Sequence, residues 1–227
     1  MTRNITDQQW LGQLNQDLVD AGHGHLLHPT VKLAFTAMQQ KAYGDGIDLQ
    51  IVSSFRSFER QLAIFNKKWR GEAILRDANG EVLDNTALSS TDKLHAILTW
   101  SALPGASRHH WGTDLDVYDR ESVHQWNGSF ELVEQEYLPQ GPCYALACWL
   151  EGNMAEFGFF RPFSENKGGV AREPWHLSHK AVATDFEQSR SIEAFASALK
   201  QSDMLGKDTV LANLPYLYNR YVLNNGS

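Results

Sequence analysis

Two short segments, far apart in the chain, contain side chains that bind metal ions and transfer protons. The first contains His109 and Asp116, and the second contains Glu173 and His176. Catalytic zinc sites commonly take three nitrogen or oxygen ligands from the protein and leave a fourth position open. His109, Asp116 and His176 therefore form a candidate open metal site, and Glu173 is the candidate base beside it.

Predicted strands and one helix could position these side chains. Residues 114–118 alternate like a strand, which places Asp114 and Asp116 on the same face. His176 lies in a second short strand candidate. Residues 48–55 form a third strand candidate, and Ser57 can cap the helix that follows through Trp69. Arg56 stands between that strand and that helix, which fixes its position.

The rest of the chain is mostly helical in pattern. A capping box of Thr6 and Gln9 predicts a helix that runs until Gly22, and Pro29 opens a second helix that stops at Gly44. Asn79-Gly80 predicts a hairpin within the polar segment 71–90. Further predicted elements are helices over 93–103, 142–157, 191–200 and 209–214 and a strand over 221–223. Scattered strands among helices predict an α+β fold around a small, mostly antiparallel sheet with surrounding helices.

Composition places the chain among ordinary globular proteins. Of its 227 residues, 42% are hydrophobic and 21% are charged, which suits a single domain over residues 1–227. Within it we expect an N-terminal helical layer at about 5–44 and a C-terminal helical extension at about 180–227. A net charge of −7 argues against nucleic-acid binding, and no apolar run has membrane-spanning length.

The N-terminus and the cysteines favour a cytoplasmic location. Residues 1–10 lack the basic segment and apolar stretch of a signal peptide. Cys143 and Cys148 lie on different faces of a predicted helix, which is poor geometry for a disulfide. We therefore expect two free, buried thiols and a reducing compartment.

Three blocks of the sequence resemble the zinc D-alanyl-D-alanine carboxypeptidases of the VanY and VanX type, which share a fold with lysostaphin-like endopeptidases and the hedgehog signalling domain. The family signature Ser-x-His, x-x-Gly-x-small-x-Asp and Glu-x-Trp-His is matched here by Ser107, His109, Gly112, Asp116, Glu173, Trp175 and His176. A third block, an Arg after a strand followed by a Gln, is matched by residues 53–57 and Gln61. The blocks occur in the family's order between about Gln50 and Ser178.

The resemblance implies roles for individual residues. It implies one Zn²⁺ per chain on the three ligands, with Glu173 as general base and Arg56 stabilising the oxyanion. Ser107, with Gln61 and Arg108 as further candidates, would contact the substrate's terminal carboxylate.

Asp114 departs from the family pattern, which has a small residue there. Three interpretations are open: a carboxylate behind a metal ligand, a carboxylate facing substrate, or part of an Asp-x-Asp site for Mg²⁺ or Mn²⁺. The histidines favour zinc. We expect His110 to point away from the metal and His179 not to join His176 on one ion. The remaining histidines are at 23, 25, 28, 95 and 124; those of the 23–28 turn are expected to be solvated, and His95 and His124 lie near loops that could border a cleft.

The implied activity is removal of the terminal D-alanine from peptidoglycan stem peptides. A cytoplasmic location favours recycled tetrapeptides and hence L,D-cleavage, with D,D-cleavage of pentapeptides as the alternative. A wall endopeptidase with the same site and a zinc-stabilised binding module are two further candidates. Glu173 argues against the binding module, because a structural zinc needs no base. The sequence does not indicate an oligomeric state.

Overall fold

A four-stranded antiparallel sheet forms the centre of the protein. The computed structural model describes residues 5–226. Residues 1–4 and 227 lie outside the described residues, and with them the start of the segment 1–10 that is predicted not to be a signal peptide. The strands are arranged in the order β3–β6–β8–β7, and every neighbouring pair is antiparallel. Their bounds are β3 (Leu49–Ser53), β6 (Asp114–Asp119), β7 (Phe159–Phe160) and β8 (His176–His179). The α+β prediction is confirmed.

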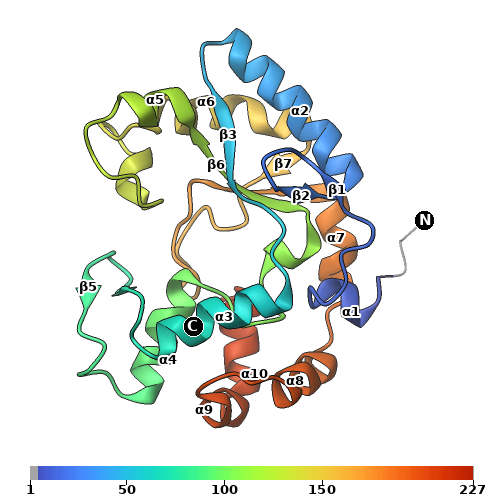
Figure 1. The fold of residues 1–227 in the computed structure, drawn as a ribbon, viewed down its shortest axis with the longest axis vertical. Helices are drawn as coiled ribbons and strands as arrows, with labels where there is room; N and C mark the ends of the chain where they lie inside the picture. The colour runs from blue at the N-terminus through green and yellow to red at the C-terminus, as the bar shows by residue number, and fades with distance from the viewer. Residues whose placement is uncertain (1–4, 227) are drawn as a thin grey trace.

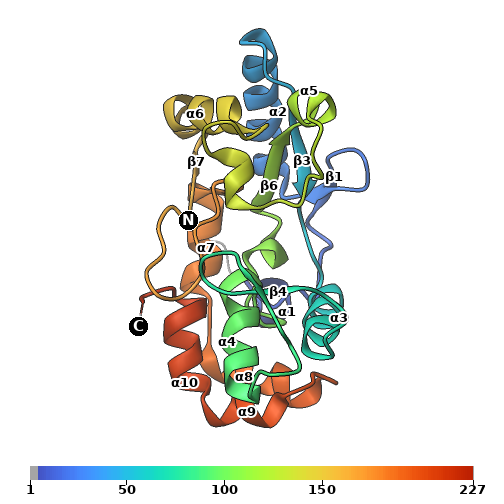
Figure 2. The same cartoon turned by 90° about the vertical axis from the view of Figure 1, so that its left-hand side faces the viewer.

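Helices are distributed around this sheet in two groups. The sheet lies with α2, α5 and α6 in the upper half of Figure 1, while α3, α4 and α8 to α10 form a helical cluster in the lower half. Figure 2 shows the same division from the side. The α-helices are α1 (Asp7–Trp10), α2 (Pro29–Gly44), α3 (Phe58–Trp69), α4 (Ser90–Trp100), α5 (Arg120–Gln125), α6 (Tyr144–Asn153), α7 (Lys180–Gln188), α8 (Ile192–Gln201), α9 (Lys207–Ala212) and α10 (Leu214–Leu217).

Short helical turns and two hairpins complete the fold. The 3₁₀ turns are η1 (Arg108–Trp111), η2 (Glu134–Tyr137) and η3 (Met154–Phe157), and a π-helical turn forms η4 (Tyr218–Val222). The hairpins pair β1 (Val19–Asp20) with β2 (Leu26–Leu27) and β4 (Leu75–Arg76) with β5 (Val82–Leu83). The hairpin predicted from Asn79-Gly80 is confirmed, whereas the strand predicted over 221–223 is wrong.

The first predicted helix is shorter than its pattern indicated. The capping box of Thr6 and Gln9 is present, but α1 ends at Trp10 and Val19 pairs with Leu27 in a hairpin. Gly12 has a φ of 75°, and a Cβ there would lie 2.4 Å from Nδ1 of His110. The chain therefore turns at Gly12, where only glycine allows the close approach to His110.

The core runs through both halves of the molecule. Val31, Phe35 and Met38 of α2 and the sheet residues Leu115 and Leu177 are buried. The lower cluster buries its own apolar side chains, among them Phe65, Leu94, Ile97, Phe195 and Leu199. Cys143 and Cys148 are both free as expected, but Cys148 is exposed, which contradicts the predicted burial.

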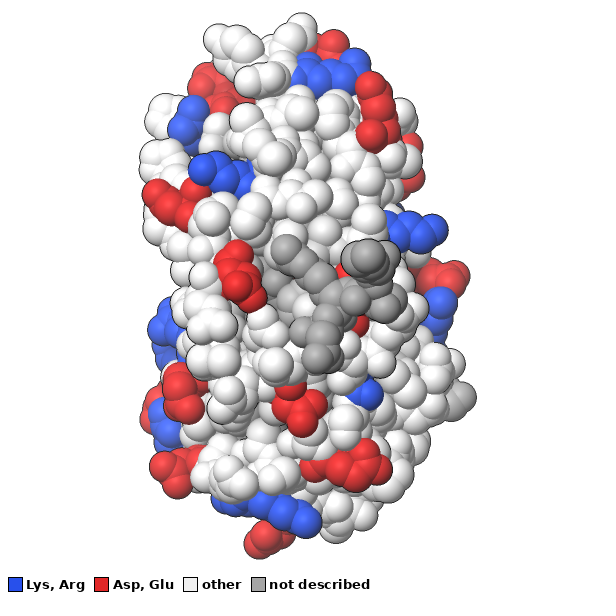
Figure 3. Space-filling view, turned by 90° about the vertical axis from the view of Figure 1, so that its right-hand side faces the viewer, with Lys and Arg blue, Asp and Glu red and all other residues white. Residues whose placement is uncertain are grey.

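Two properties of the structure bear on nucleic-acid binding and on membrane insertion. On the face drawn in Figure 3, the described Lys and Arg side chains are interspersed with Asp and Glu side chains and do not gather into one basic area. This face lacks the electrostatic footprint of a nucleic-acid interface. Within residues 5–226, no helix is both long enough and apolar enough to cross a membrane.

Candidate metal centre and substrate pocket

The pairing of β6 with β8 brings two of the predicted ligands together. Asp116 lies directly opposite His176 in the antiparallel register, and Asp114 lies opposite Ser178. Alternate residues of a strand project to the same face, so both aspartates of β6 lie on the side of the sheet that carries His176. All of these side chains are buried.

His109 reaches the same point from the turn η1. Gly112 ends this turn with a φ of 65°, and a Cβ there would lie 2.5 Å from Leu18, so glycine is required where the chain enters β6. The Nδ1 atom of His109 lies 2.9 Å from the carbonyl oxygen of Ser54. A carbonyl only accepts, so Nδ1 carries the hydrogen and Nε2 is left to face Asp116 Oδ2 at 3.3 Å.

These three residues fit a divalent cation. His109, Asp116 and His176 each offer one ligand atom, and the three atoms lie within 4.8 Å of one another. Oδ1 of Asp116 is buried without a hydrogen-bond partner, although Nδ1 of His176 lies 3.2 Å away. Imidazole lone pairs and carboxylate oxygens that face each other in a buried site require a positive charge between them.

The electrostatics of His176 and Asp116 indicate the same requirement. Burial lowers the pKa of His176, but contacts with Asp114, Asp116 and Glu173 outweigh it and hold the pKa well above the usual value. Burial raises the pKa of Asp116, but the two histidines outweigh that effect and lower it. The pocket therefore favours an ionised carboxylate and a cation beside it. Two imidazoles and one carboxylate are the ligand types of catalytic zinc.

Asp114 lies behind His176. Its Oδ1 atom is 3.3 Å from Nε2 of His176 and accepts a hydrogen bond from Nε of Arg108 at 2.8 Å, while Oδ2 accepts from Thr113 Oγ1 at 3.0 Å. Burial raises the pKa of Asp114, but Arg108 and His176 lower it further than burial raises it. These contacts favour the interpretation of Asp114 as an orienting carboxylate over the substrate-facing and Asp-x-Asp interpretations.

Arg108 is fully engaged by the protein. Besides Asp114, its guanidinium donates to Glu187 Oε1 at 2.5 Å and to Ser178 Oγ at 2.7 Å, and it lies over the ring of Trp111. The predicted contact between Arg108 and a substrate carboxylate is therefore disfavoured. Its observed contacts fix Asp114 instead.

Gln61 also has protein partners in place of the predicted substrate contact. Its side chain is fully buried in α3; Oε1 accepts from Nη1 of Arg56 at 2.8 Å, and Nε2 donates to the carbonyl of Ala102 at 2.8 Å and to Ser101 Oγ at 3.2 Å. Arg56 makes a second side-chain bond to Ser53 Oγ at 3.0 Å. Gln61 therefore positions Arg56.

Arg56 and Glu173 face one pocket next to the ligand set. Burial lowers the pKa of Arg56, and the negative charges of Asp116 and Glu173 partly offset this. Glu173 Oε2 lies 3.3 Å from His176 Nδ1, and the backbone N–H of Glu173 donates to Phe163 at 2.9 Å. The base candidate is therefore held next to the metal ligands.

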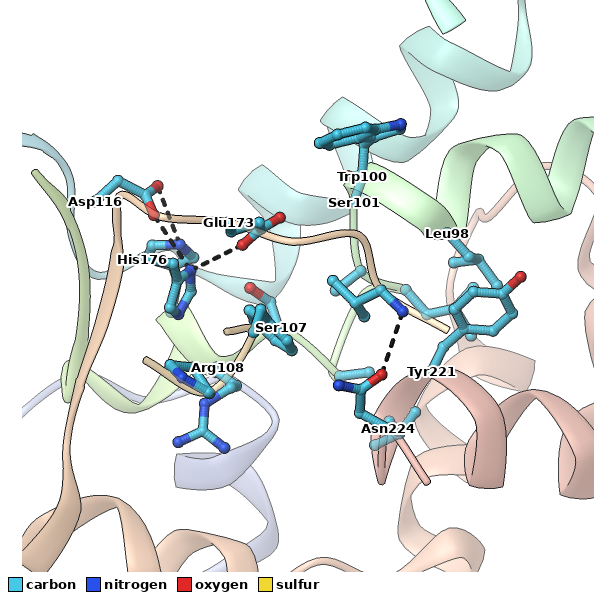
Figure 4. A pocket seen from close by; sticks show the side chains of 18 of the residues that line it. Leu98, Trp100, Ser101, Ser107, Arg108, Asp116, Glu173, His176, Tyr221 and Asn224 are labelled. Carbon is cyan, nitrogen blue, oxygen red and sulfur yellow. Dashed lines mark hydrogen bonds and ion pairs between the residues drawn. The ribbon is translucent and has the colours of Figure 1, made fainter. Parts of the chain in front are cut away.

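The pocket is larger than the ligand set alone requires. It has a volume of about 530 Å³. Glu173, His176 and Ser107 lie at one end and Leu98, Tyr221 and Asn224 at the other (Figure 4). The substrate contact of Ser107 stays a prediction: its side chain lines the pocket, and no hydrogen bond within residues 5–226 engages its hydroxyl.

Sequence reasoning missed four of the cations that line this pocket, Lys68, Arg76, Lys167 and Arg190, and its C-terminal wall. Lys68 of α3 lines it together with residues 221–225. Lys68 follows the buried residues Gln61 and Phe65 by seven and three positions, so its place on the buried stripe of α3 was the available signal. Nothing in the pattern of residues 221–225 indicated that they would reach the site.

In the described part of the chain, the other histidines do not belong to a group of three or more possible metal ligands. His110 contacts the carbonyl of Arg56 through Nδ1 and accepts from the N–H of Gly105 at 3.0 Å, so it points away from the metal as expected. His179 does not join the ligand set and packs edge-on against Phe159. His25 contacts Ser54 and His95 contacts the hydroxyl of Tyr221. The expectation of a solvated 23–28 turn is wrong for His28, which is buried and whose Nδ1 accepts from the N–H of Thr30 at 3.2 Å at the start of α2.

Comparison with known proteins identifies related sequences and folds. Residues 24–182 match the family model described as VanY, D-alanyl-D-alanine carboxypeptidase. An uncharacterized protein of Haemophilus influenzae is 32% identical over 127 residues, which are 55% of this chain and 96% of that protein.

Two solved structures share the fold at low identity. The LdcB LD-carboxypeptidase superimposes with a TM-score of 0.54 at 23% identity over 81% of this chain and 79% of that one. A mutant of the vancomycin resistance D,D-pentapeptidase VanY, in complex with Zn(II), superimposes with a TM-score of 0.53 at 22% identity over 81% of this chain and 90% of that one.

Proposed function

The chain belongs to the VanY family of D-alanyl-D-alanine carboxypeptidases, and from this premise we propose that it is a zinc carboxypeptidase that removes the terminal D-alanine from peptidoglycan stem peptides. Within that class we propose L,D-cleavage of tetrapeptides, with D,D-cleavage of pentapeptides as the alternative. The observation that carries the proposal is the ligand set of His109, Asp116 and His176, with Glu173 Oε2 at 3.3 Å from Nδ1 of His176.

In this proposal the three ligand residues hold one zinc ion. The Zn(II) complex of the VanY D,D-pentapeptidase supports the choice of metal, as does the donor set of two imidazoles and one carboxylate. Bound zinc supplies Lewis-acid activation of the scissile carbonyl and of the attacking water. The protein's own part is to orient the imidazoles, which Ser54 does for His109 and Asp114 does for His176.

Glu173 moves the proton. Its carboxylate accepts a proton from the attacking water and then delivers that proton to the departing amine nitrogen. General acid–base catalysis of this kind contributes about 10²–10⁴ in rate. A zinc-stabilised binding module would have no use for this carboxylate.

Arg56 stabilises the charge that develops on the carbonyl oxygen. Gln61 and Ser53 hold the guanidinium in place through bonds of 2.8 and 3.0 Å, so its position is set before the substrate arrives. Removal of one such donor typically costs about 10²–10³ in kcat. Ser107 offers a free hydroxyl to the substrate on the same pocket wall.

Mass spectrometry of muropeptides tests both the proposal and its alternatives. The zinc-loaded enzyme is incubated with tetrapeptide, pentapeptide and cross-linked dimer. Loss of one alanine from the tetrapeptide supports L,D-cleavage, loss of one alanine from the pentapeptide supports D,D-cleavage, and separation of the dimer supports the endopeptidase. If no substrate changes, the proposed function is wrong.

Two variants separate the base from the ligands. Glu173→Gln should keep its zinc by elemental analysis and lose alanine release, whereas Glu156→Gln, on an exposed residue that does not line the pocket, should behave like wild type. His176→Ala should lose zinc. Full activity in Glu173→Gln would show that another group is the base, and wild-type zinc content in His176→Ala would exclude it as a ligand.

A further inference from the structure

One cation of the substrate pocket stands apart from the others because the protein does not pair it. Lys68 lies in the last turn of α3, on the stripe that buries Gln61 and Phe65. Its side chain is half-buried and lines the pocket together with Arg56 and Glu173. Helical side chains lean toward the N-terminus of their helix, which directs the ammonium toward the end of α3 where Arg56 lies.

The other cations that line the pocket have partners. Arg108 binds Asp114 and Glu187, Arg76 pairs with Glu131 at 2.8 Å, and Lys167 pairs with Glu165 at 3.4 Å. Arg56 is held by Gln61 and Ser53, and Arg190 donates to the carbonyls of Glu187 and Val222. Within residues 5–226, the ammonium of Lys68 makes neither a hydrogen bond nor an ion pair.

An unpaired ammonium in such a position is costly to the free protein. Burial lowers the pKa of Lys68 to about 8. The negative charge of Glu173 raises this pKa, and the positive charge of Arg56 lowers it, but both effects are smaller than that of burial. An incoming anion would relieve this cost, because it would supply the partner that the fold omits.

The substrate of a carboxypeptidase supplies such an anion. Two of the three residues predicted to bind its carboxylate, Gln61 and Arg108, are occupied within the protein, and the third, Ser107, is neutral. We infer that Lys68 is a specificity-determining residue that binds a carboxylate of the substrate beside the scissile bond. The inference rests on the proposed carboxypeptidase function and adds a charged contact between the pocket and the substrate.

Steady-state kinetics of three lysine variants test this inference. Lys68→Met keeps most of the aliphatic stem and removes the charge, Lys68→Arg keeps the charge, and Lys67→Met is the matched control because Lys67 is exposed and does not line the pocket. We expect Lys68→Met to raise KM about 10–100-fold, the range for loss of one charge-assisted hydrogen bond, with kcat little changed. Lys68→Arg should recover most of the loss, and Lys67→Met should match wild type.

Amidated peptides identify which carboxylate is bound. If the terminal carboxylate is the partner, a peptide with a terminal carboxamide should be as poor a substrate for wild type as for Lys68→Met. If an internal acid of the stem peptide is the partner, amidation of that acid should have the same effect. The inference is overturned if Lys68→Met has the same KM as wild type on the free acids. It is also overturned if the ratio of the KM of Lys68→Met to that of wild type is the same on every amidated peptide as on the free acid.

Binding measurements keep this test separate from that of the proposed function. Calorimetry of the tetrapeptide with Glu173→Gln, with and without Lys68→Met, reports the contact without turnover. Wild type that releases no alanine would refute the proposed function, whereas equal affinities in the two Glu173→Gln proteins would refute the role of Lys68 alone.

Discussion

Nε2 of His176 lies 3.3 Å from Oδ1 of Asp114, on the side of the imidazole ring away from Asp116. A carboxylate in this place fixes the tautomer and orientation of a ligand imidazole, and loss of such a partner typically costs about 10–100-fold in metal affinity. We therefore predict that Asp114→Asn binds zinc about 10–100-fold more weakly than wild type. Competition with a chromophoric chelator measures this, and Asp203→Asn on the exposed surface is the control.

The same substitution should also destabilise the fold. Asp114 is the buried partner of Arg108, and removal of one member of a buried ion pair typically costs about 3–5 kcal/mol. Thermal melts of the zinc-free proteins separate this effect from the loss of metal binding. A variant that melts earlier but binds zinc as tightly as wild type would show that Asp114 serves stability only.

Gln61 gives a second prediction, because it acts on the reaction through Arg56. Gln61→Leu removes the acceptor that holds the guanidinium at 2.8 Å and leaves the carbonyl of Ala102 without its donor. Misplacement of a reacting group by about 1 Å can cost about 10²-fold, so we expect kcat to fall by about 10- to 100-fold while zinc content stays at one per chain. Unsatisfied buried groups should lower stability by about 1–3 kcal/mol.

Gln201→Leu, on the exposed side of α8, is the matched control for this prediction. The informative readout is the division of the effect between kcat and KM. If Gln61 contacted the substrate directly, as the sequence predicted, KM would rise with kcat unchanged, and the positioning role would be wrong.

The contrast between Asp116 and Gln61 explains how far the sequence predicts the site. His109 and Asp116 are seven residues apart, and strand alternation places the aspartate on the ligand face, so local rules describe their geometry. The partners of Gln61 and Arg108 come from remote segments: Ala102 is 41 residues from Gln61, and Glu187 is 79 residues from Arg108. A local sequence pattern does not indicate which buried polar groups will contact each other. Gln61 and Arg108 were therefore predicted to contact substrate.

The fold shows the same limit. The pattern from Trp10 to Val19 satisfies a helix locally, yet Gly12 must pass close to His110, and Val19 pairs with Leu27. At Gly12 and at Val19, tertiary contacts therefore override the local helical propensity. The strand predicted over 221–223 is likewise replaced by the turn η4, whose Tyr221 reaches His95 across 126 residues at 2.8 Å. By contrast, α2, α3 and α8 begin and end near their predicted positions because caps and apolar periodicity agree.

Lys68 gives a pH prediction. Burial lowers its pKa to about 8, while Glu173 and Arg56 are the charged groups that act on it from the pocket. Below this pH the ammonium is charged and can bind a carboxylate, and above it the charge is lost, so KM should rise as the pH increases through about 8. In Lys68→Arg the guanidinium stays charged, so the rise should disappear. A rise of equal size in Lys68→Arg would assign this titration to another group.

The two cysteines predict different reactivity with iodoacetamide. Cys143 is buried at the start of α6, and burial raises the pKa of its thiol to about 11, whereas Cys148 is exposed. Thiolates are the reactive form, so at pH 8 the folded protein should be alkylated at Cys148 and remain unmodified at Cys143 until it is unfolded. Intact-mass measurement and peptide mapping distinguish one modified site from two. Alkylation of both residues at similar rates in folded protein would contradict the burial of Cys143.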